Sequence, residues 1–214
     1  MATTIYLIRH GESLGNLEKR FLGHSDWDLT EKGKKQAEFA AGYFENIKVD
    51  AIYSSDLLRA YNTALPLSKC KGIDIIPDKN LREIFAGDWE TVKFDDIASR
   101  FSAEWKIWSN AEGDKLRIPN GESIAELLER VYAAIEKIAI ENEGKSVVIA
   151  LHATPIRVFM NKVSGRELCD LSKTPWVANA SVSKFSFDGK TFTLEKGDDT
   201  AHLGDIKTVL PKGV

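Results

Sequence analysis

Two histidines in this chain stand just after short apolar runs, and an arginine precedes the first of them. His10 follows the run 4–8 with Arg9 between them, and His152 follows the run 146–151. A neutral imidazole is a competent nucleophile, and the planar guanidinium of arginine matches the oxygens of a phosphate group. These residue types predict an anion-binding pocket in which a histidine attacks a phosphate ester.

Cleavage of a phosphate ester needs a nucleophile, cations for the phosphate, and a proton for the leaving alcohol. His10 is the candidate nucleophile, because positive charge on Arg9 and Arg59 disfavours its protonated form. His152 would stabilise charge on the transferred group. A carboxyl group near a bound dianion has a raised pKa and becomes a proton donor, and Glu83 is the preferred candidate. Spacing alone does not select it over three other acidic residues, Glu12, Asp88 and Glu90.

Strand-like and helix-like segments alternate along the chain, which is typical of an α/β layer fold. Strands are predicted over 3–8, 51–53, 73–76 and 146–151, and the first and last of these, which precede the histidines, are expected to be buried. A hairpin is predicted from 182 to 194 with a two-residue turn at Asp188-Gly189. In an open α/β sheet, ligands bind outside the carboxyl ends of the strands. Both histidines are placed there, and Arg59 lies just after another predicted strand.

The apolar periodicity predicts several helices between these strands. The first helix runs from a cap at Thr30 to Phe44, and the second runs from a cap at Asp56 to a stop or bend at Pro66. Two more are predicted over 94–108 and 123–140. A further helix starts near Pro155 and is capped by Thr154. The helix over 94–108 carries an aromatic stripe. That stripe is most simply core packing, with a substrate-covering role as the alternative.

The bulk composition is that of an ordinary soluble globular protein, and we expect one domain over residues 1–214. The chain has 214 residues, a net charge of −3, 43% hydrophobic and 29% charged residues. The near-neutral charge argues against nucleic-acid binding, and no apolar run is long enough to span a membrane. The absence of a secretory signal and the presence of two cysteines, Cys70 and Cys169, in no metal spacing predict free thiols in a reducing cytoplasm. A homodimer is an option that no sequence feature supports.

Several short blocks follow one another in a fixed order over nearly the whole chain. They are Arg9–Ser13 with Asn16, the segment from Gly23 through Leu29-Thr30 to Gln36-Ala37, Ser54–Leu57 with Arg59, Leu81–Ile84, Asn120–Ser123 and Asn179–Val182. Taken in this order, the blocks resemble the phosphoglycerate-mutase-like branch of the histidine phosphatase superfamily. The resemblance implies a three-layer α/β fold with a mostly parallel central sheet and helices on both faces.

The resemblance also implies a role for each matching residue. His10 would be phosphorylated, Arg9, Arg59 and His152 would complete the phosphate pocket, and Glu83 would donate the proton. Substrate contacts would come from Asn16, Ser13 and the backbone near Gly23. Ser13 is not assigned as a nucleophile, because no Gly-x-Ser-x-Gly elbow surrounds it. The family uses no metal and no cofactor is expected, so the implied partner is a small phosphorylated substrate.

The leading hypothesis is a phosphomonoesterase, and the alternative is a cofactor-dependent phosphoglycerate mutase. Mutases of this family typically have tryptophan just before the asparagine of the first block, where this chain has Leu14-Gly15-Asn16. They also have an Asn-Glu-Arg acid block, where this chain has Arg82-Glu83-Ile84. Both differences favour hydrolysis. A non-catalytic phosphate-binding module is a third hypothesis.

The chain departs from the family pattern at a few positions. Ala153 follows the second histidine and Thr91 follows Trp89-Glu90, both where glycine is common, and Asp28 stands where proline is common. Ala153 puts the geometry of the pocket in question. His24 and His202 are expected to have structural roles.

Overall fold

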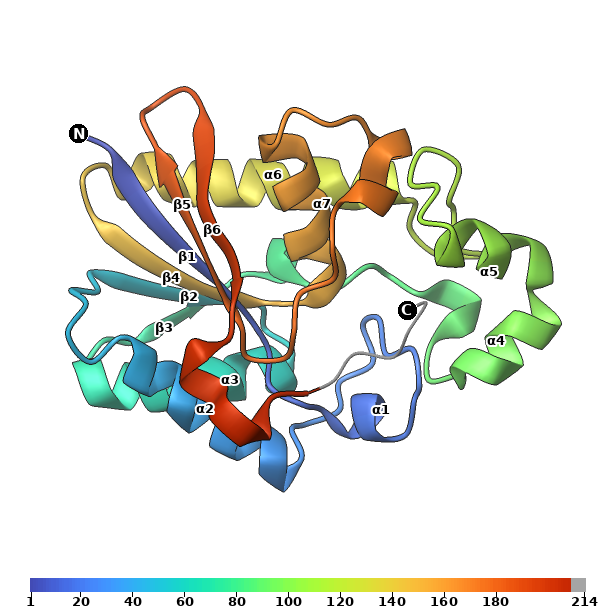
Figure 1. Ribbon diagram of the computed structural model, residues 1–214, viewed down its shortest axis with the longest axis horizontal. Helices are drawn as coiled ribbons and strands as arrows, with labels where there is room; N and C mark the ends of the chain where they lie inside the picture. The colour runs from blue at the N-terminus through green and yellow to red at the C-terminus, as the bar shows by residue number, and fades with distance from the viewer. Residues whose placement is uncertain (209–214) are drawn as a thin grey trace.

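The computed structural model describes residues 1–208, and its centre is a six-stranded mixed sheet (Figure 1). The strands lie in the order β3 (Ile75–Pro77), β2 (Ala51–Ser54), β4 (Ser146–Leu151), β1 (Thr3–Arg9), β5 (Val182–Phe187) and β6 (Phe192–Asp199). The first four are mutually parallel, whereas β5 is antiparallel to both of its neighbours. The predicted α/β fold is confirmed.

Helices cover both faces of the sheet, and β1 shows why. Its alternate residues point to opposite faces: Ile5 and Leu7 join one buried cluster, while Tyr6 and Ile8 join another. The first cluster includes residues of α6 (Ile124–Glu141) and α7 (Ala153–Val163). The second includes residues of α2 (Glu31–Tyr43) and α3 (Leu58–Lys71). Burial on both faces explains why β1 and β4 are continuous apolar runs.

The predicted starts of two helices are confirmed by their caps. Thr30 accepts the N–H of Gly33 at the start of α2, at 3.0 Å. Ser123 forms a reciprocal capping box with Glu126 at the start of α6. Because these caps satisfy N–H groups that a helix leaves unpaired, they set where the helices begin.

Two other predicted caps are wrong. Leu57, not Asp56, precedes α3, because the Asp56 carboxylate instead forms two 2.6 Å bonds with Arg82. The N–H of Leu58 takes the Asp26 carboxylate as its partner, at 2.7 Å. Likewise α7 is preceded by His152 rather than Thr154, so Thr154 and Pro155 lie inside its first turn.

Of the two outcomes predicted for α3 at Pro66, an end or a bend, the end is wrong. The helix continues through Pro66 to Lys71. Proline removes one backbone donor, but Ala64 and Leu67 beside it are fully buried in the core and keep the helix packed on the sheet.

The predicted helix over 94–108 is two helices, α4 (Phe94–Arg100) and α5 (Ser102–Ser109). The break lies at Phe101, where φ is −128° and ψ is 50°. It brings the rings of Phe94 and Trp105 to 5.9 Å between centroids, whereas a straight helix would separate them by about 16 Å along its axis. In Figure 1 the two helices α4 and α5 project to one side of the molecule, beside α1 (Leu14–Leu17).

The hairpin of β5 and β6 is present, but its loop has four residues, 188–191, rather than two. The Asp188 carboxylate accepts the N–H groups of Lys190 and Thr191 at 2.9 and 2.8 Å. These side-chain bonds stabilise the longer turn in place of a two-residue one.

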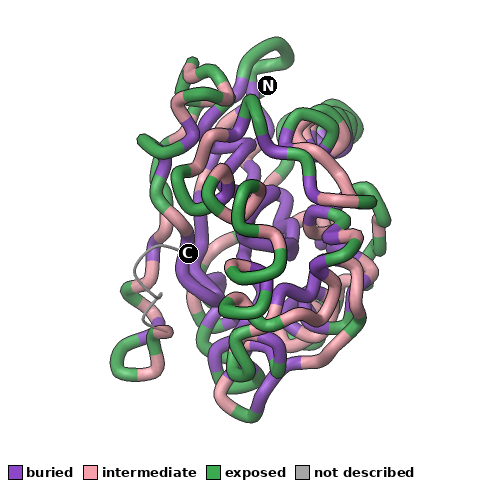
Figure 2. The backbone as a smooth tube through the Cα atoms, turned by 90° about the vertical axis from the view of Figure 1, so that its right-hand side faces the viewer, coloured by how far each residue is buried: buried purple, intermediate pink, exposed green. Residues whose placement is uncertain are grey.

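Buried backbone is concentrated in the sheet and on the inner sides of the helices, and exposed backbone lies on the outer turns (Figure 2). Short 3-10 turns complete the chain at Lys79–Leu81, Gly87–Trp89, Leu168–Lys173 and Ala201–Ile206. Among residues 1–208, no helix has the length and apolar character needed to cross a bilayer.

Candidate active site

The two predicted histidines meet at the carboxyl ends of the central strands. The N–H of His10 donates to the carbonyl of Leu151, the last residue of β4, at 2.9 Å. His10 and His152 are 4% and 0% exposed. Their rings lie 5.2 Å apart between centroids, at an interplanar angle of 62°. The parallel pairing of β1 with β4 thus brings together two residues that are 142 positions apart in the sequence.

The ring of His10 is held in one tautomer. Its Nδ1 lies 2.7 Å from the carbonyl oxygen of Gly11. A carbonyl only accepts, so Nδ1 carries the proton and Nε2 keeps a lone pair. Burial, and then the charges of Arg59 and Arg9, lower the pKa of His10 well below its ordinary value. The ring is therefore neutral, with Nε2 as the basic nitrogen.

Arg9 and Arg59 are buried cations whose partners are backbone carbonyls. Arg9 donates to the carbonyl of Val177 at 2.6 Å, and Arg59 donates to Ser25 and Gly23 at 2.9 and 2.7 Å. Burial lowers the pKa of each arginine to about 10, which leaves both charged at neutral pH. Within residues 1–208, the Nε of Arg9 is buried without a hydrogen-bond partner. An anion would provide that acceptor.

His152 is held by a serine that sequence reasoning did not assign. Its Nε2 lies 2.9 Å from the hydroxyl of Ser55, which also accepts the N–H of Leu57. The hydroxyl proton can donate to Nε2, an arrangement in which Nδ1 carries the ring proton. In the described part of the chain this Nδ1 has no partner. Burial, followed by the charge of Arg59, lowers the pKa of His152 well below its ordinary value, so the ring is neutral.

Glu83 lines the same cavity as His10, Arg9 and Arg59. Its two carboxyl oxygens accept the N–H groups of Ile84 and Thr154 at 2.9 and 3.3 Å. Burial raises its pKa, against the opposing effect of these bonds and of Arg59. A raised pKa in a carboxyl beside the histidine pair suits a proton donor.

The structure separates Glu83 from the other acidic candidates. Glu90 accepts N–H groups from Ser25, His24 and Ala86, so its oxygens are used within the loop. Asp88 is exposed and bonds to Asn120. Glu12 lines the cavity, but its oxygens contact Thr30 and Lys32.

The three predicted substrate contacts all line the cavity, yet each is also structural. Ser13 and Asn16 form a capping box that starts α1. Gly23 has a φ of +50°, and its carbonyl accepts from Arg59. The amide nitrogen of Asn16, which donates to no group among residues 1–208, and the backbone of Gly23 remain candidates for substrate binding. The Ser13 hydroxyl is engaged in the turn.

Asn179 is a site residue that we recognised in the sequence only as part of a matching block. Its amide nitrogen donates to the carbonyl of His10 and to Asn16 at 3.0 and 3.1 Å. It follows no predicted strand and shows no periodicity, so its place beside His10 becomes visible only in three dimensions.

A cavity of about 320 Å³ extends from Arg9, His10 and Arg59. Its outer wall is largely apolar, formed by Leu17, Phe21, Leu22, Phe94, Trp108 and Trp176, with Lys19 and Arg20 also lining it. The aromatic stripe over 94–108 contributes both to the core and to the cavity wall, and its role in covering a substrate stays a prediction. Phe94 and Trp108 face the cavity, while Ile97 is buried in the core and Trp105 packs against it.

The structure also describes the positions where the chain departs from the family pattern and the two histidines outside the pair. Ala153 begins α7 and lines the cavity without a left-handed backbone, so its methyl group forms part of the wall. Thr91 does have a positive φ, +62°, which explains the family's preference for glycine there. His24 and His202 donate to the carbonyls of Glu83 and Ala180, both at 2.9 Å, which are structural contacts.

The sequence matches the description "Histidine phosphatase superfamily (branch 1)" over residues 5–200. It is 31% identical to phosphoserine phosphatase 1 of Hydrogenobacter thermophilus, over 98% of this chain and 99% of that protein. It is also 31% identical to the probable phosphoglycerate mutase GpmB of Yersinia pestis, covering 93% of this chain and 94% of that protein.

Among solved structures, Bacillus stearothermophilus YhfR superposes on this fold with a TM-score of 0.90 and 32% identity, covering 94% of this chain and 99% of that one. These matches confirm the predicted family and the predicted enzyme class, a phosphatase of the phosphoglycerate mutase type. The chain belongs to branch 1 of the histidine phosphatase superfamily.

Proposed function

We propose that this protein hydrolyses small phosphate monoesters through a phosphohistidine on His10, without a metal. The observation that carries the proposal is the state of His10: a neutral ring with Nδ1 donating to Gly11, near two buried arginines and Glu83. Nucleophile, anion-binding cations and proton donor are thus assembled around one cavity.

In the first step, the Nε2 lone pair of His10 attacks phosphorus while the ester P–O bond breaks. The electron pair of that bond moves to the leaving oxygen, which takes the proton of the Glu83 carboxyl group. The imidazole becomes a cation when its nitrogen is phosphorylated, and the Gly11 carbonyl stabilises it through Nδ1–H. Arg9, Arg59 and His152 stabilise the charge on the transferring oxygens.

In the second step, the Glu83 carboxylate takes a proton from water as the water oxygen attacks phosphorus. The P–N bond breaks, its electron pair returns to Nε2, and inorganic phosphate leaves. Glu83 is again protonated and His10 is again neutral, so the cycle closes. Since these residues supply every proton and charge, we expect activity to persist in EDTA.

Two features favour hydrolysis over the mutase alternative. A mutase must bind a carboxylate and a second phosphate, which requires further cations. Ile84, at the position of the mutase arginine, is fully buried, and most of the outer cavity wall is apolar. Of the two further cations within residues 1–208 that line the cavity, Lys19 and Arg20, Arg20 is paired with Glu18 and donates to the Thr91 carbonyl. The relative named phosphoserine phosphatase 1 supports hydrolysis. Because another relative is named a probable phosphoglycerate mutase, the experiment also tests for mutase activity.

We also propose where the enzyme acts and what kind of substrate it takes. The exposed thiols of Cys70 and Cys169 support a reducing compartment, the cytoplasm. The net charge of −3 and the size of the cavity support a small phosphorylated substrate rather than nucleic acid.

The experiment combines a panel of phosphate esters with trapping of the intermediate. We expect phosphate release from an aryl phosphate and an acid-labile phosphoenzyme, both lost in His10→Ala. A phosphoenzyme that persists in His10→Ala would show that His10 is the wrong nucleophile. Fast conversion of 3-phosphoglycerate to 2-phosphoglycerate in the presence of 2,3-bisphosphoglycerate, outrunning phosphate release, would establish the mutase instead.

A further inference from the structure

The proton donor Glu83 stands on a segment without regular secondary structure. Residues 83–86 belong to no helix or strand, so their backbone groups need partners other than a regular ladder. We call residues 82–86 the acid loop. An acid on such a loop donates its proton efficiently only if the loop is held in one position.

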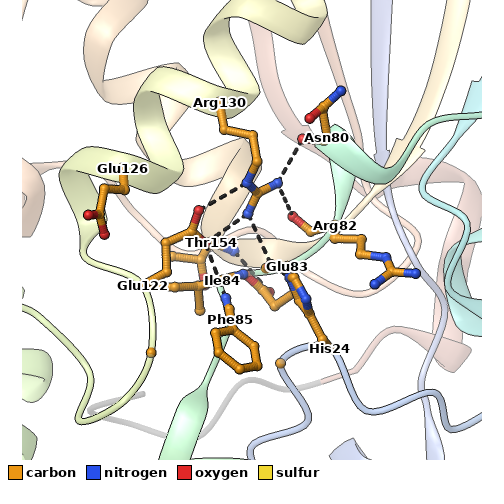
Figure 3. A network of polar contacts seen from close by, with 12 residues as sticks. His24, Asn80, Arg82, Glu83, Ile84, Phe85, Glu122, Glu126, Arg130 and Thr154 are labelled. Carbon is orange, nitrogen blue, oxygen red and sulfur yellow. Dashed lines mark hydrogen bonds and ion pairs between the residues drawn. The ribbon is translucent and has the colours of Figure 1, made fainter.

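Arg130 of α6 donates to three backbone carbonyls in and before the acid loop (Figure 3). Its Nη1 donates to Asn80 at 2.7 Å and to Arg82 at 3.1 Å, and its Nη2 donates to Glu83 at 3.2 Å. One guanidinium therefore fixes the chain on the amino-terminal side of the acid and at the acid itself. A planar fork with five N–H donors has the geometry for this, which a lysine lacks.

Glu122 completes the arrangement on the carboxyl-terminal side. Its carboxylate accepts from Arg130 at 3.0 and 2.8 Å and from the N–H of Phe85 at 3.1 Å. The backbone N–H of Glu122 in turn donates to the Phe85 carbonyl at 2.9 Å. The side chains of Arg130 and Glu122 are only 21% and 14% exposed, so solvent screens this pair less than it would an exposed one.

His24 adds a second donor to the Glu83 carbonyl. Its Nε2 lies 2.9 Å from that oxygen, and its ring rests against Phe85 at 5.2 Å between centroids. The carbonyl of Glu83 is therefore bonded from the α6 side by Arg130 and from the loop of Gly23 by His24 (Figure 3). The backbone N–H of the next residue, Ile84, donates to the Glu83 carboxyl group at 2.9 Å. The position of the backbone therefore affects the position of the carboxyl group.

We propose that Arg130, paired with Glu122, is a positioning residue that holds the acid loop so that the carboxyl group of Glu83 faces the leaving oxygen. This inference rests on the proposed function, because it requires Glu83 to be the general acid. Arg130 does not line the cavity that holds His10, so its effect would pass through Glu83.

The test uses two substrates whose leaving groups differ in their need for a proton. The anion of 2,4-dinitrophenol leaves without protonation, whereas the alkoxide of an alkyl phosphate needs a general acid. We expect Arg130→Gln to lower kcat/KM for the alkyl phosphate roughly 10- to 100-fold, which is part of the roughly 10²- to 10⁴-fold that a general acid contributes. The kcat/KM for 2,4-dinitrophenyl phosphate, which reports phosphorylation of His10 and not the later hydrolysis step in which Glu83 also acts, should stay within about threefold of wild type. That retained activity also reports a folded phosphate site.

Companion variants make the result specific. Arg130→Lys should recover only part of the alkyl activity, and Glu122→Gln should show the same substrate dependence in weaker form. The matched control is Arg117→Gln, which removes an arginine paired with Glu126 of the same helix, at 59% and 50% exposure. It should change neither activity.

The outcomes separate this inference from the proposed function. If Glu83→Gln selectively impairs the alkyl phosphate but Arg130→Gln and Glu122→Gln lower both activities equally, the positioning role is overturned and the proposed function stands. If Glu83→Gln shows no selectivity either, the assignment of the acid is overturned, and the inference with it.

Discussion

Gly23 offers the sharpest test of how the site is built. The resemblance assigns its backbone to substrate contact, but the structure gives it a structural role as well. Its φ is +50°, a conformation that costs other residues about 1–2 kcal/mol. A methyl carbon on Gly23 would lie 2.2 Å from a Glu90 oxygen and 2.5 Å from the methyl of Ala86. Such contacts require something to move.

The displaced group would be the Glu90 carboxylate, which holds the N–H groups of His24, Ser25 and Ala86. Overpacking of a filled site costs about 1–3 kcal/mol. Added to the cost of the left-handed backbone for a residue other than glycine, this overpacking means that Gly23→Ala should lower the free energy of unfolding by about 2–5 kcal/mol. In a domain of this size, each kcal/mol lowers Tm by roughly 2–4 °C.

The assay is denaturant unfolding of Gly23→Ala beside a glycine control that has room. Gly42 lies within α2, and apart from its chain neighbours and the nearby backbone of that helix, no atom of residues 1–208 lies within 4 Å of the position its methyl would take. Gly42→Ala should therefore stabilise the protein by up to about 1 kcal/mol, since alanine is the better helix former. If Gly23→Ala unfolds within about 1 kcal/mol of wild type, the packing argument is refuted and substrate contact alone explains the glycine.

Three further predictions follow from the same geometry. Thr91→Gly should stabilise the protein by about 1 kcal/mol in thermal unfolding, because it relieves a β-branched residue at a φ of +62°; unchanged or lower stability would mean that the backbone is not strained there. Burial raises the pKa of Glu83, so its acid form persists to higher pH than that of an exposed glutamate. The kcat for an alkyl phosphate should fall as pH rises through that raised pKa, and a Glu83→Gln profile that kept this alkaline limb would contradict the assignment. Arg59→Lys should lower kcat/KM roughly 10- to 100-fold, because an ammonium cannot bond to Gly23, Ser25 and a phosphate in one plane. A change below about threefold in a steady-state assay would argue against phosphate binding by Arg59.

The strands that carry the histidines could be predicted because the physics that forms them is local. A parallel strand buried on both faces is a continuous apolar run, so 146–151 was identified with its bounds as observed for β4. The rule that ligands bind at the carboxyl ends of such strands then placed His10 and His152 together. The central part of the site follows from the pattern of hydrophobicity and from this topological rule.

The residues that support the site could not be predicted in that way, because their partners are distant backbone atoms. Arg130 occupies a polar position on α6, where an exposed arginine is ordinary, and its three carbonyl partners lie 47–50 positions away. Asp56 looked like a helix cap, but a bidentate bond to Arg82 is stronger than a single capping bond. The break at Phe101 likewise depends on tertiary packing, since nothing in 94–108 interrupts the helical period.

The carbonyl partners of Arg9 and Arg59 explain how the pocket keeps its positive charge. Two buried guanidinium groups need acceptors, and carboxylates would be the strongest ones. Carboxylate partners would neutralise the charge that the proposed function requires to attract a phosphate dianion. Carbonyls from Val177, Ser25 and Gly23 satisfy N–H groups while leaving that charge in place. The same positive charge disfavours protonation of His10, so in the proposed reaction a single arrangement would both attract the phosphate and keep His10 neutral.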